Sequence, residues 1–171
     1  MLPPSDTRIV AFTGHRPEFL PFGDDESSPS CQALKARLRR EIIKFAQLGA
    51  TIFSCGIARG IDIICGELVV SILDEYPNVS FCCVLPYRNH GQRWPSSWRD
   101  RHNALLSKAH WIDCLNETSH RGCFHQRDRY LVEGADALIA VYDGRATGGT
   151  AYTVQYARKI GVEVIVIDPK Q

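Results

Sequence analysis

The sequence has no excess of charge of either sign, because 20 Lys and Arg residues face 19 Asp and Glu residues and leave a formal net charge of +1. No general field therefore attracts polyanions, and an anion site must be built locally. The sequence also lacks a run of eighteen apolar residues, and its start has no basic segment followed by an apolar one. We therefore expect a cytoplasmic protein that neither spans a membrane nor is exported.

Motifs for metal binding and covalent catalysis are missing as well. Three histidines and two cysteines share the segment 110–125, but their spacing matches no paired-ligand zinc pattern, so we predict no metal site. No serine stands in a nucleophile-elbow pattern, and no cysteine has an obvious base neighbour in sequence. The seven cysteines, including the adjacent Cys82 and Cys83, are expected to be reduced and buried.

The composition and the pattern of apolar residues predict the fold class. The 171 residues are 44% hydrophobic and 23% charged, close to the average of globular proteins, and we expect one domain over residues 1–171. Short β-branched runs alternate with longer amphipathic ones, which predicts an α/β fold, a Rossmann-like three-layer sandwich with a mostly parallel sheet. The predicted strands lie near 8–13, 51–55, 79–85, 111–115, 136–142 and 162–167. The predicted helices lie near 30–48, 59–75, 98–109, 123–134 and 149–160.

Two strand segments, 136–144 and 162–169, are nearly all apolar, as strands covered on both faces must be. We therefore expect both at or near the centre of the sheet. The stretch 86–97 carries two prolines, a glycine and mixed charge between a strand and a helix. Its length and position predict a lid or rim over a site.

In an open parallel sheet, ligands bind beyond the carboxyl ends of the strands. After the first strand, Gly14 would let a ligand approach the backbone, and Arg16 offers a forked donor for a phosphate. A plain turn with a surface arginine is the alternative. After the second strand, the segment 54–62 (SCGIARGID) places Gly56 and Gly60 around a helix start, whose free amides would favour an anion. A tight turn with close helix packing explains these glycines equally well.

The Gly-rich turn 142–150, after the fifth strand, is the strongest candidate for a phosphate cradle. It ends in Gly148, Gly149 and Thr150 at the start of a predicted helix. It lacks the lysine of a Walker loop and the three-glycine spacing of a dinucleotide fingerprint, so neither of those classes is supported.

Four stretches of the chain carry a family resemblance: TGHRPEFLPFG (13–23), SCGIARGIDIICGELV (54–69), FHQRDRYLVEGADALIAVYDG (124–144) and GGTAYTVQYARKIG (148–161). Together they resemble the YpsA-like branch of the SLOG superfamily, which also contains the DNA-processing protein DprA and the LOG phosphoribohydrolases. The resemblance spans most of the chain and implies a Rossmann-like fold. The second stretch is also similar to the Ser-Gly-x-Ala-x-Gly-Ile-Asp segment of an anion pocket in DprA, except that Cys55 falls between Ser54 and Gly56.

The third stretch resembles the LOG segment in which a histidine and an arginine precede a buried strand, and these match His125 and Arg127. In LOG enzymes that arginine works with a glutamate, and the corresponding position here is Thr153. Breaking an N-glycosidic bond creates an oxocarbenium-like centre that a carboxylate stabilises, and a threonine cannot carry that charge. The resemblance therefore disfavours a LOG-type hydrolase.

Our first hypothesis is a sensor or regulatory protein that binds a nucleotide or nucleotide-derived ligand through its phosphate. The residues expected around the ligand are Gly14, His15, Arg16, Gly56, Arg59, Gly60, Asp62, Asp143, Gly148, Gly149 and Thr150. The candidates for stacking on its base are Tyr87, Trp94 and Tyr152.

Two alternatives stay open. An enzyme acting at the ribose of a nucleotide would use Arg127 with Asp143 or Asp62 in place of the missing glutamate. Binding of single-stranded DNA, as in DprA, would need arginines beside Trp94 and Trp98, although the balanced net charge disfavours it. The arginines concerned are Arg88, Arg93, Arg99 and Arg101. The resemblance also implies a homo-oligomer, most simply a dimer.

Overall fold

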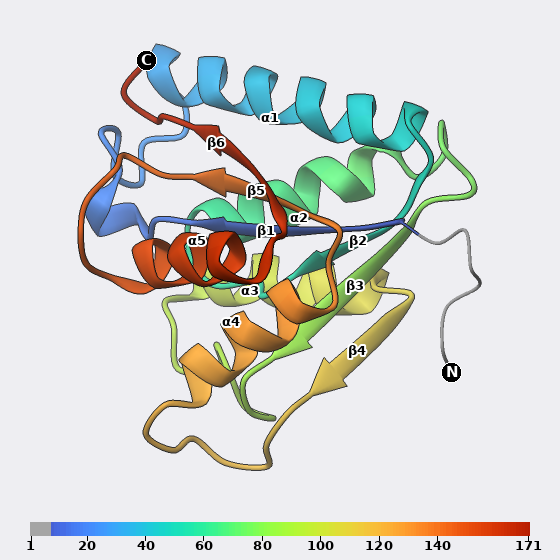
Figure 1. The fold of residues 1–171 in the computed structure, drawn as a ribbon. Helices are drawn as coiled ribbons and strands as arrows, with labels where there is room; N and C mark the ends of the chain where they lie inside the picture. The colour runs from blue at the N-terminus through green and yellow to red at the C-terminus, as the bar shows by residue number, and fades with distance from the viewer. Residues whose placement is uncertain (1–7) are drawn as a thin grey trace.

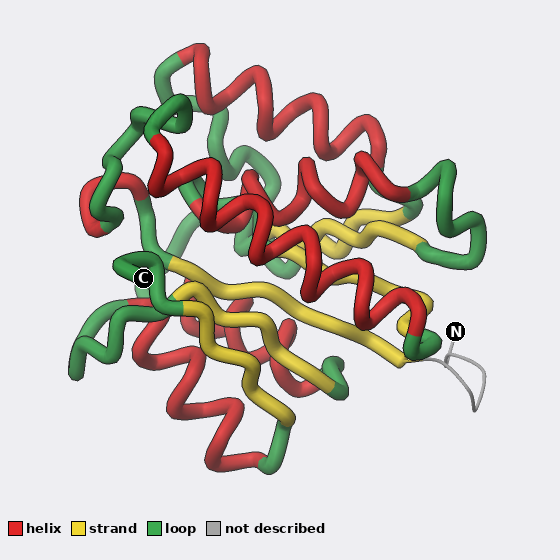
Figure 2. Tube along the Cα trace, turned by 90° about the horizontal axis from the view of Figure 1, so that it is seen from above, coloured by secondary structure: helices red, strands yellow, loops and turns green. Residues whose placement is uncertain are grey.

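The computed structural model describes residues 8–171 and places a six-stranded sheet between two layers of helices (Figures 1 and 2). The strands are β1 (Arg8–Gly14), β2 (Ala50–Cys55), β3 (Ser80–Leu85), β4 (Trp111–Cys114), β5 (Ala137–Val141) and β6 (Glu163–Ile167). The helices are α1 (Pro29–Gln47), α2 (Ile61–Ile72), α3 (Ser96–Lys108), α4 (Cys123–Glu133) and α5 (Gly149–Ile160), and a 3-10 turn η1 (Pro17–Phe19) follows β1.

The strand order is β4-β3-β2-β1-β5-β6, and every neighbouring pair is parallel. The predicted α/β fold is confirmed, and the sheet is parallel throughout. Helices α1, α2 and α3 pack beside one another on one face, while α4 and α5 pack together on the other face (Figure 2). The order reverses at β1, because the chain builds outward from β1 to β4 and then returns to place β5 on the other side of β1.

Local sequence signals account for several helix ends. Ser28 caps α1 by accepting a hydrogen bond from the Cys31 amide at 3.2 Å, and Pro29 occupies the first helical position, where no amide is needed. Gly161 ends α5 in the left-handed conformation, with φ +83°. Both signals fix the direction in which the chain enters or leaves the sheet.

The core explains the strand pattern. Helices α1, α2 and α3 bury one face of the central strands, where Phe12, Phe53 and Phe81 are at most 1% exposed. Strand β5 is buried at every residue. Among residues 8–171, no helix has the length and apolarity needed to cross a membrane.

Two sequence-based expectations need correction. Strand β6 lies at an edge of the sheet, and its Val166 is 42% exposed. The prediction of a central position failed because an apolar run alone does not distinguish an edge strand from a central one. Strand β5 does lie near the centre, as expected, because it pairs with β1, and β1 and β2 are the two central strands. All seven cysteines are free and six are buried, but Cys114 is exposed because it ends the edge strand β4.

Candidate functional site

A cavity of about 400 Å³ opens beyond the carboxyl end of β1, where the strand order reverses. In open α/β sheets this reversal leaves a crevice between loops that diverge to opposite faces, and ligands bind there. Its walls come from the ends of β1, the start of α2, the first turns of α4 and the turn before α5. The lining residues are Phe12, Thr13, Gly14, His15, Arg16, Phe19, Ala58, Asp62, Phe124, His125, Arg127, Asp128, Leu131, Arg145, Thr147, Gly148, Gly149 and Thr150.

The start of α5 forms one wall of the cavity with its glycines open to the interior. A Cβ atom added to Gly148 or Gly149 would meet no atom within 4 Å. Gly148 has φ +106°, whereas Gly149 has a backbone conformation that any residue can adopt. The first bond of the α5 ladder runs from the Tyr152 amide to the Gly148 carbonyl, so the earlier amides have no carbonyl one turn before them. This wall can donate hydrogen bonds to an anion.

The glycines before α2 have a different environment. A Cβ on Gly56 would lie 2.5 Å from Nη1 of Arg127, and one on Gly60 would lie 2.7 Å from the His15 carbonyl oxygen. Neither glycine lines the cavity, and Arg59 lies outside it too, in an ion pair of 2.8 Å with Glu18. At this turn, protein atoms occupy the space that the glycines leave.

Three charged side chains, Asp62, Arg127 and Asp128, meet at the floor of the cavity. Arg127 is 5% exposed and donates from Nε to Asp128 at 2.9 Å and from Nη1 to the Gly56 carbonyl at 2.9 Å. Asp62 is 7% exposed and accepts a hydrogen bond from the Ala58 amide at 3.2 Å. Burial raises the pKa of Asp62 to about 6, although Arg127 and the Ala58 amide both favour its charged form. A perturbed carboxyl in a cleft is typical of a functional site.

Asp143 lies behind the cavity wall, and its carboxylate is fully engaged. Arg145 donates to it from Nε at 2.9 Å and from Nη2 at 2.6 Å, and Nε2 of His15 lies 3.2 Å away. The hydrogen bonds from Arg145 hold the pKa of Asp143 well below its usual range, while burial lowers the pKa of His15. Asp143 therefore orients Arg145 and His15, both of which line the cavity.

Arg16 has the most available guanidinium on the rim of the cavity. Its side chain is exposed, lies over the Phe124 ring at 5.6 Å, and has no hydrogen bond or ion pair with any other residue in 8–171. A guanidinium in this state can turn its fork toward an incoming phosphate.

The three predicted stacking residues do not line the cavity. Tyr87 packs edge-on against Phe124, with ring centroids 6.1 Å apart, and Trp94 packs against His90 at 4.8 Å. The stretch 86–97 is thus held by aromatic contacts beside the cavity. Tyr152 lies parallel to the exposed His125 ring, with centroids 4.1 Å apart.

Aromatic groups that the sequence analysis did not assign to the ligand do line the cavity, namely Phe12, Phe19, Phe124 and the ring of His125. Arg145 and Asp128 were likewise not assigned to the site. The available signals were the position of Arg145 within the Gly-rich turn and of Asp128 beside Arg127.

The position that corresponds to the LOG glutamate holds no acid. Thr153 is 2% exposed, and its hydroxyl donates to the Gly149 carbonyl at 2.9 Å, within its own helix. The cavity does contain a carboxyl group with a raised pKa, namely that of Asp62.

The arginines of the proposed DNA surface are mostly paired with acids. Arg88 forms an ion pair with Glu117, Arg99 with Asp100, and Arg101 with both Glu26 and Glu67. Trp98 is 7% exposed and lies under Arg101. Arg93 is exposed and has no ion pair within residues 8–171, so it is the one arginine of this set that offers free positive charge beside the half-buried Trp94.

The comparison with protein families identifies the group to which these features belong. The YspA SLOG family model (YpsA) matches residues 10–168, which include every wall of the cavity. The chain belongs to this SLOG family. UPF0398 proteins of Bacillus thuringiensis (strain Al Hakam) and Bacillus cereus (strain Q1) are each 27% identical to this SLOG chain over 157 residues, covering 90% of it and 84% of the relative.

Solved structures share the fold of this SLOG chain. DNA processing protein A from Helicobacter pylori, whose structure concerns single-stranded DNA binding, superposes with a TM-score of 0.63 at 18% identity, covering 96% of this chain and 70% of that one. The structural genomics target TM1055 gives a TM-score of 0.55 at 18% identity, covering 92% and 72%. At this identity the likeness shows the fold alone.

Proposed function

We propose that this SLOG domain binds a nucleotide or nucleotide-derived molecule through its phosphate, in a sensor or regulatory role. The observation that carries the proposal is the open Gly148-Gly149 start of α5 inside a cavity of about 400 Å³. Free helix amides and the helix dipole favour a negative group there, and the unpaired Arg16 adds positive charge on the same rim. A volume of this size suits a small molecule.

The base and ribose of such a ligand would extend toward the aromatic side of the cavity. Phe19, Phe124 and His125 offer ring faces or edges there. Thr150, in the first turn of α5, lines the cavity, is 7% exposed and offers a hydroxyl. The proposal thus assigns the phosphate to α5 and the base and ribose to η1 and α4.

The first test uses calorimetric titration with AMP, with adenosine as the ligand that lacks phosphate. Gly149→Val should weaken AMP binding by at least about 1.5 kcal/mol, roughly tenfold, because a branched side chain displaces a charged acceptor from the amides. The melting temperature should change little, because the added Cβ meets no protein atom and φ is ordinary. Gly134→Val, at the far end of α4, is the control and should leave AMP affinity unchanged. Equal AMP binding by the wild type and Gly149→Val would remove α5 from the site.

A second test compares Arg16 and Arg59, which the sequence analysis both placed around the ligand. Arg16→Ala should cost about 1.5–3 kcal/mol of AMP affinity for each hydrogen bond to phosphate that it removes. Arg59→Ala should cost much less, because Arg59 is paired with Glu18 outside the cavity. A greater loss from Arg59→Ala would move the phosphate to the turn before α2.

The enzyme alternative makes a chromatographic prediction. We expect no adenine release when the wild type is incubated with AMP, because Thr153 replaces the acid and Asp143 is held by Arg145. Adenine release that is abolished in Asp62→Asn would establish the hydrolase instead.

Single-stranded DNA is the second candidate ligand, supported by the likeness to DNA processing protein A. The ion pairs that Arg99 and Arg101 form beside Trp98 argue against that surface. The self-association implied by the family resemblance stays a prediction.

A further inference from the structure

The turn between β2 and α2 contains a strained residue. Ile57 has φ +43°, and it is the one residue other than glycine with positive φ among residues 8–171. For a β-branched side chain this conformation is a genuine outlier, which persists only when the surroundings impose it. Ile57 is fully buried, so the surroundings can be identified.

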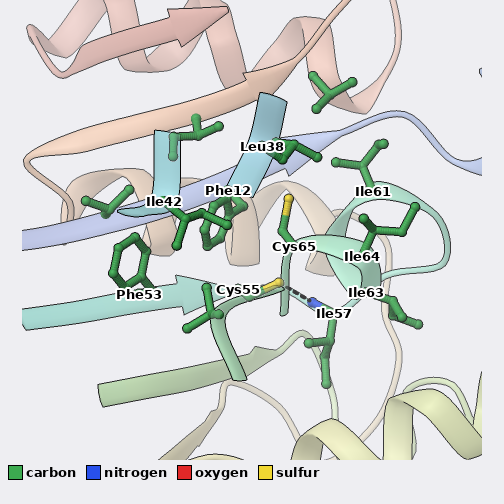
Figure 3. Packing of buried hydrophobic residues seen from close by; sticks show 14 of the residues in the cluster. Phe12, Leu38, Ile42, Phe53, Cys55, Ile57, Ile61, Ile63, Ile64 and Cys65 are labelled. Atoms are coloured by element: carbon green, nitrogen blue, oxygen red, sulfur yellow. Dashed lines mark hydrogen bonds between the residues drawn. The ribbon is translucent and has the colours of Figure 1, made fainter. Parts of the chain in front are cut away.

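Three side chains hold the turn around Ile57. Nδ1 of His102, on α3, lies 3.0 Å from the Ile57 carbonyl oxygen. The Cys55 sulfur accepts from the Ile57 amide at 3.4 Å (Figure 3) and donates to the Asp62 carbonyl at 3.1 Å. Arg127 donates to the carbonyl of Gly56 at 2.9 Å. The next amide, that of Ala58, then points at the Asp62 carboxylate.

His102 is a permanent donor in this arrangement. A carbonyl oxygen only accepts, so the His102 proton must be on Nδ1. Its ring is fully buried against His90 and Trp94, and Nε2 has no hydrogen-bond partner in the described chain. Burial lowers the pKa of His102, which keeps the ring neutral with one proton.

We infer that His102 is a positioning residue of the cavity: by holding the Ile57 carbonyl, it keeps the Ala58 amide on Asp62 and Asp62 in place on the cavity floor. The part of the inference that concerns the effect of His102 on ligand binding rests on the proposed function. The groups that face Asp62 are Arg127 and Asp128 from α4, Arg16 from the turn after β1, and the thiols of Cys55 and Cys65. None of these contacts the Ile57 carbonyl, so His102 acts through the backbone alone.

The test compares three variants by amide hydrogen exchange. His102→Leu removes the donor at similar volume, and the Ala58 amide should exchange roughly five- to tenfold faster, the effect of losing one hydrogen bond. His102→Asn keeps a donor near the position of Nδ1 and should restore most of the protection.

Leu105→Ala is the matched control. Leu105 is 3% exposed on the same helix, and its apolar side chain cannot donate a hydrogen bond to the Ile57 carbonyl. It should lower the melting temperature without selectively exposing the Ala58 amide. Unchanged Ala58 exchange in His102→Leu, or no recovery of protection in His102→Asn, would overturn the inference. The exchange needs no ligand, whereas titration of the same variants with AMP tests the proposed function. AMP affinity should fall in His102→Leu and recover with the Ala58 protection.

Discussion

Arg127→Met should lower the free energy of unfolding by about 3–5 kcal/mol, because it removes one partner from a buried ionic group. The guanidinium is 5% exposed, and its loss leaves Asp128 and the Gly56 carbonyl without their donor. Asp62 also loses the positive charge that opposes its burial. Methionine fills similar space, so lost packing contributes little.

Urea unfolding at pH 8 measures this effect. Arg129→Met is the control on the same helix, because Arg129 is only half-buried and bonds to the neutral Tyr152 hydroxyl, and we expect a much smaller change in its unfolding midpoint. A loss below about 1 kcal/mol in Arg127→Met would mean that water replaces the guanidinium and that the floor of the cavity is hydrated.

Asp62→Asn should stabilise the protein above pH 6 by roughly 3 kcal/mol, since one pKa unit corresponds to about 1.36 kcal/mol. The pKa of Asp62 is raised from 3.8 to about 6 by burial, so the folded state binds the proton more tightly than the unfolded state. The contribution of Asp62 to the stability of the wild type must therefore fall as pH rises from about 4 to 6, and no further above that range. Asparagine stays neutral and can still accept from the Ala58 amide.

Unfolding curves at pH 4 and pH 8 check the sign. The two proteins should have nearly equal stability at pH 4, and the variant should be more stable at pH 8. Lower stability of Asp62→Asn at pH 8 would show that the attraction to Arg127 outweighs the desolvation. The expected result would mean that the chain keeps a destabilising carboxylate in its cavity, as functional sites often do.

The fold was accessible from sequence because it depends on patterns that recur along the chain. Alternating apolar and amphipathic runs located the strands and helices and predicted a parallel sheet. The order of the strands across the sheet leaves no signal in the local sequence of each strand. The apolar run of β6 therefore predicted a central strand where the structure has an edge.

The candidate site also has parts that a local sequence pattern predicts and parts that depend on residues distant in sequence. The turn at Gly148 and Gly149 could be located because it is a glycine-rich connection from a predicted strand to a predicted helix, and ligands bind at the carboxyl ends of parallel strands. The environment of Gly56 could not, because it depends on Arg127, 71 residues away in sequence. The strain at Ile57 likewise depends on His102, 45 residues away.

The most direct test of phosphate binding at α5 is a titration of the 15N-labelled protein with AMP, followed by amide chemical shifts. We predict saturable shifts that are largest at Gly149, Thr150 and Ala151, where the free amides begin α5. Adenosine should shift these amides much less. No saturable shift with AMP, or shifts confined to the turn 54–62, would contradict the account.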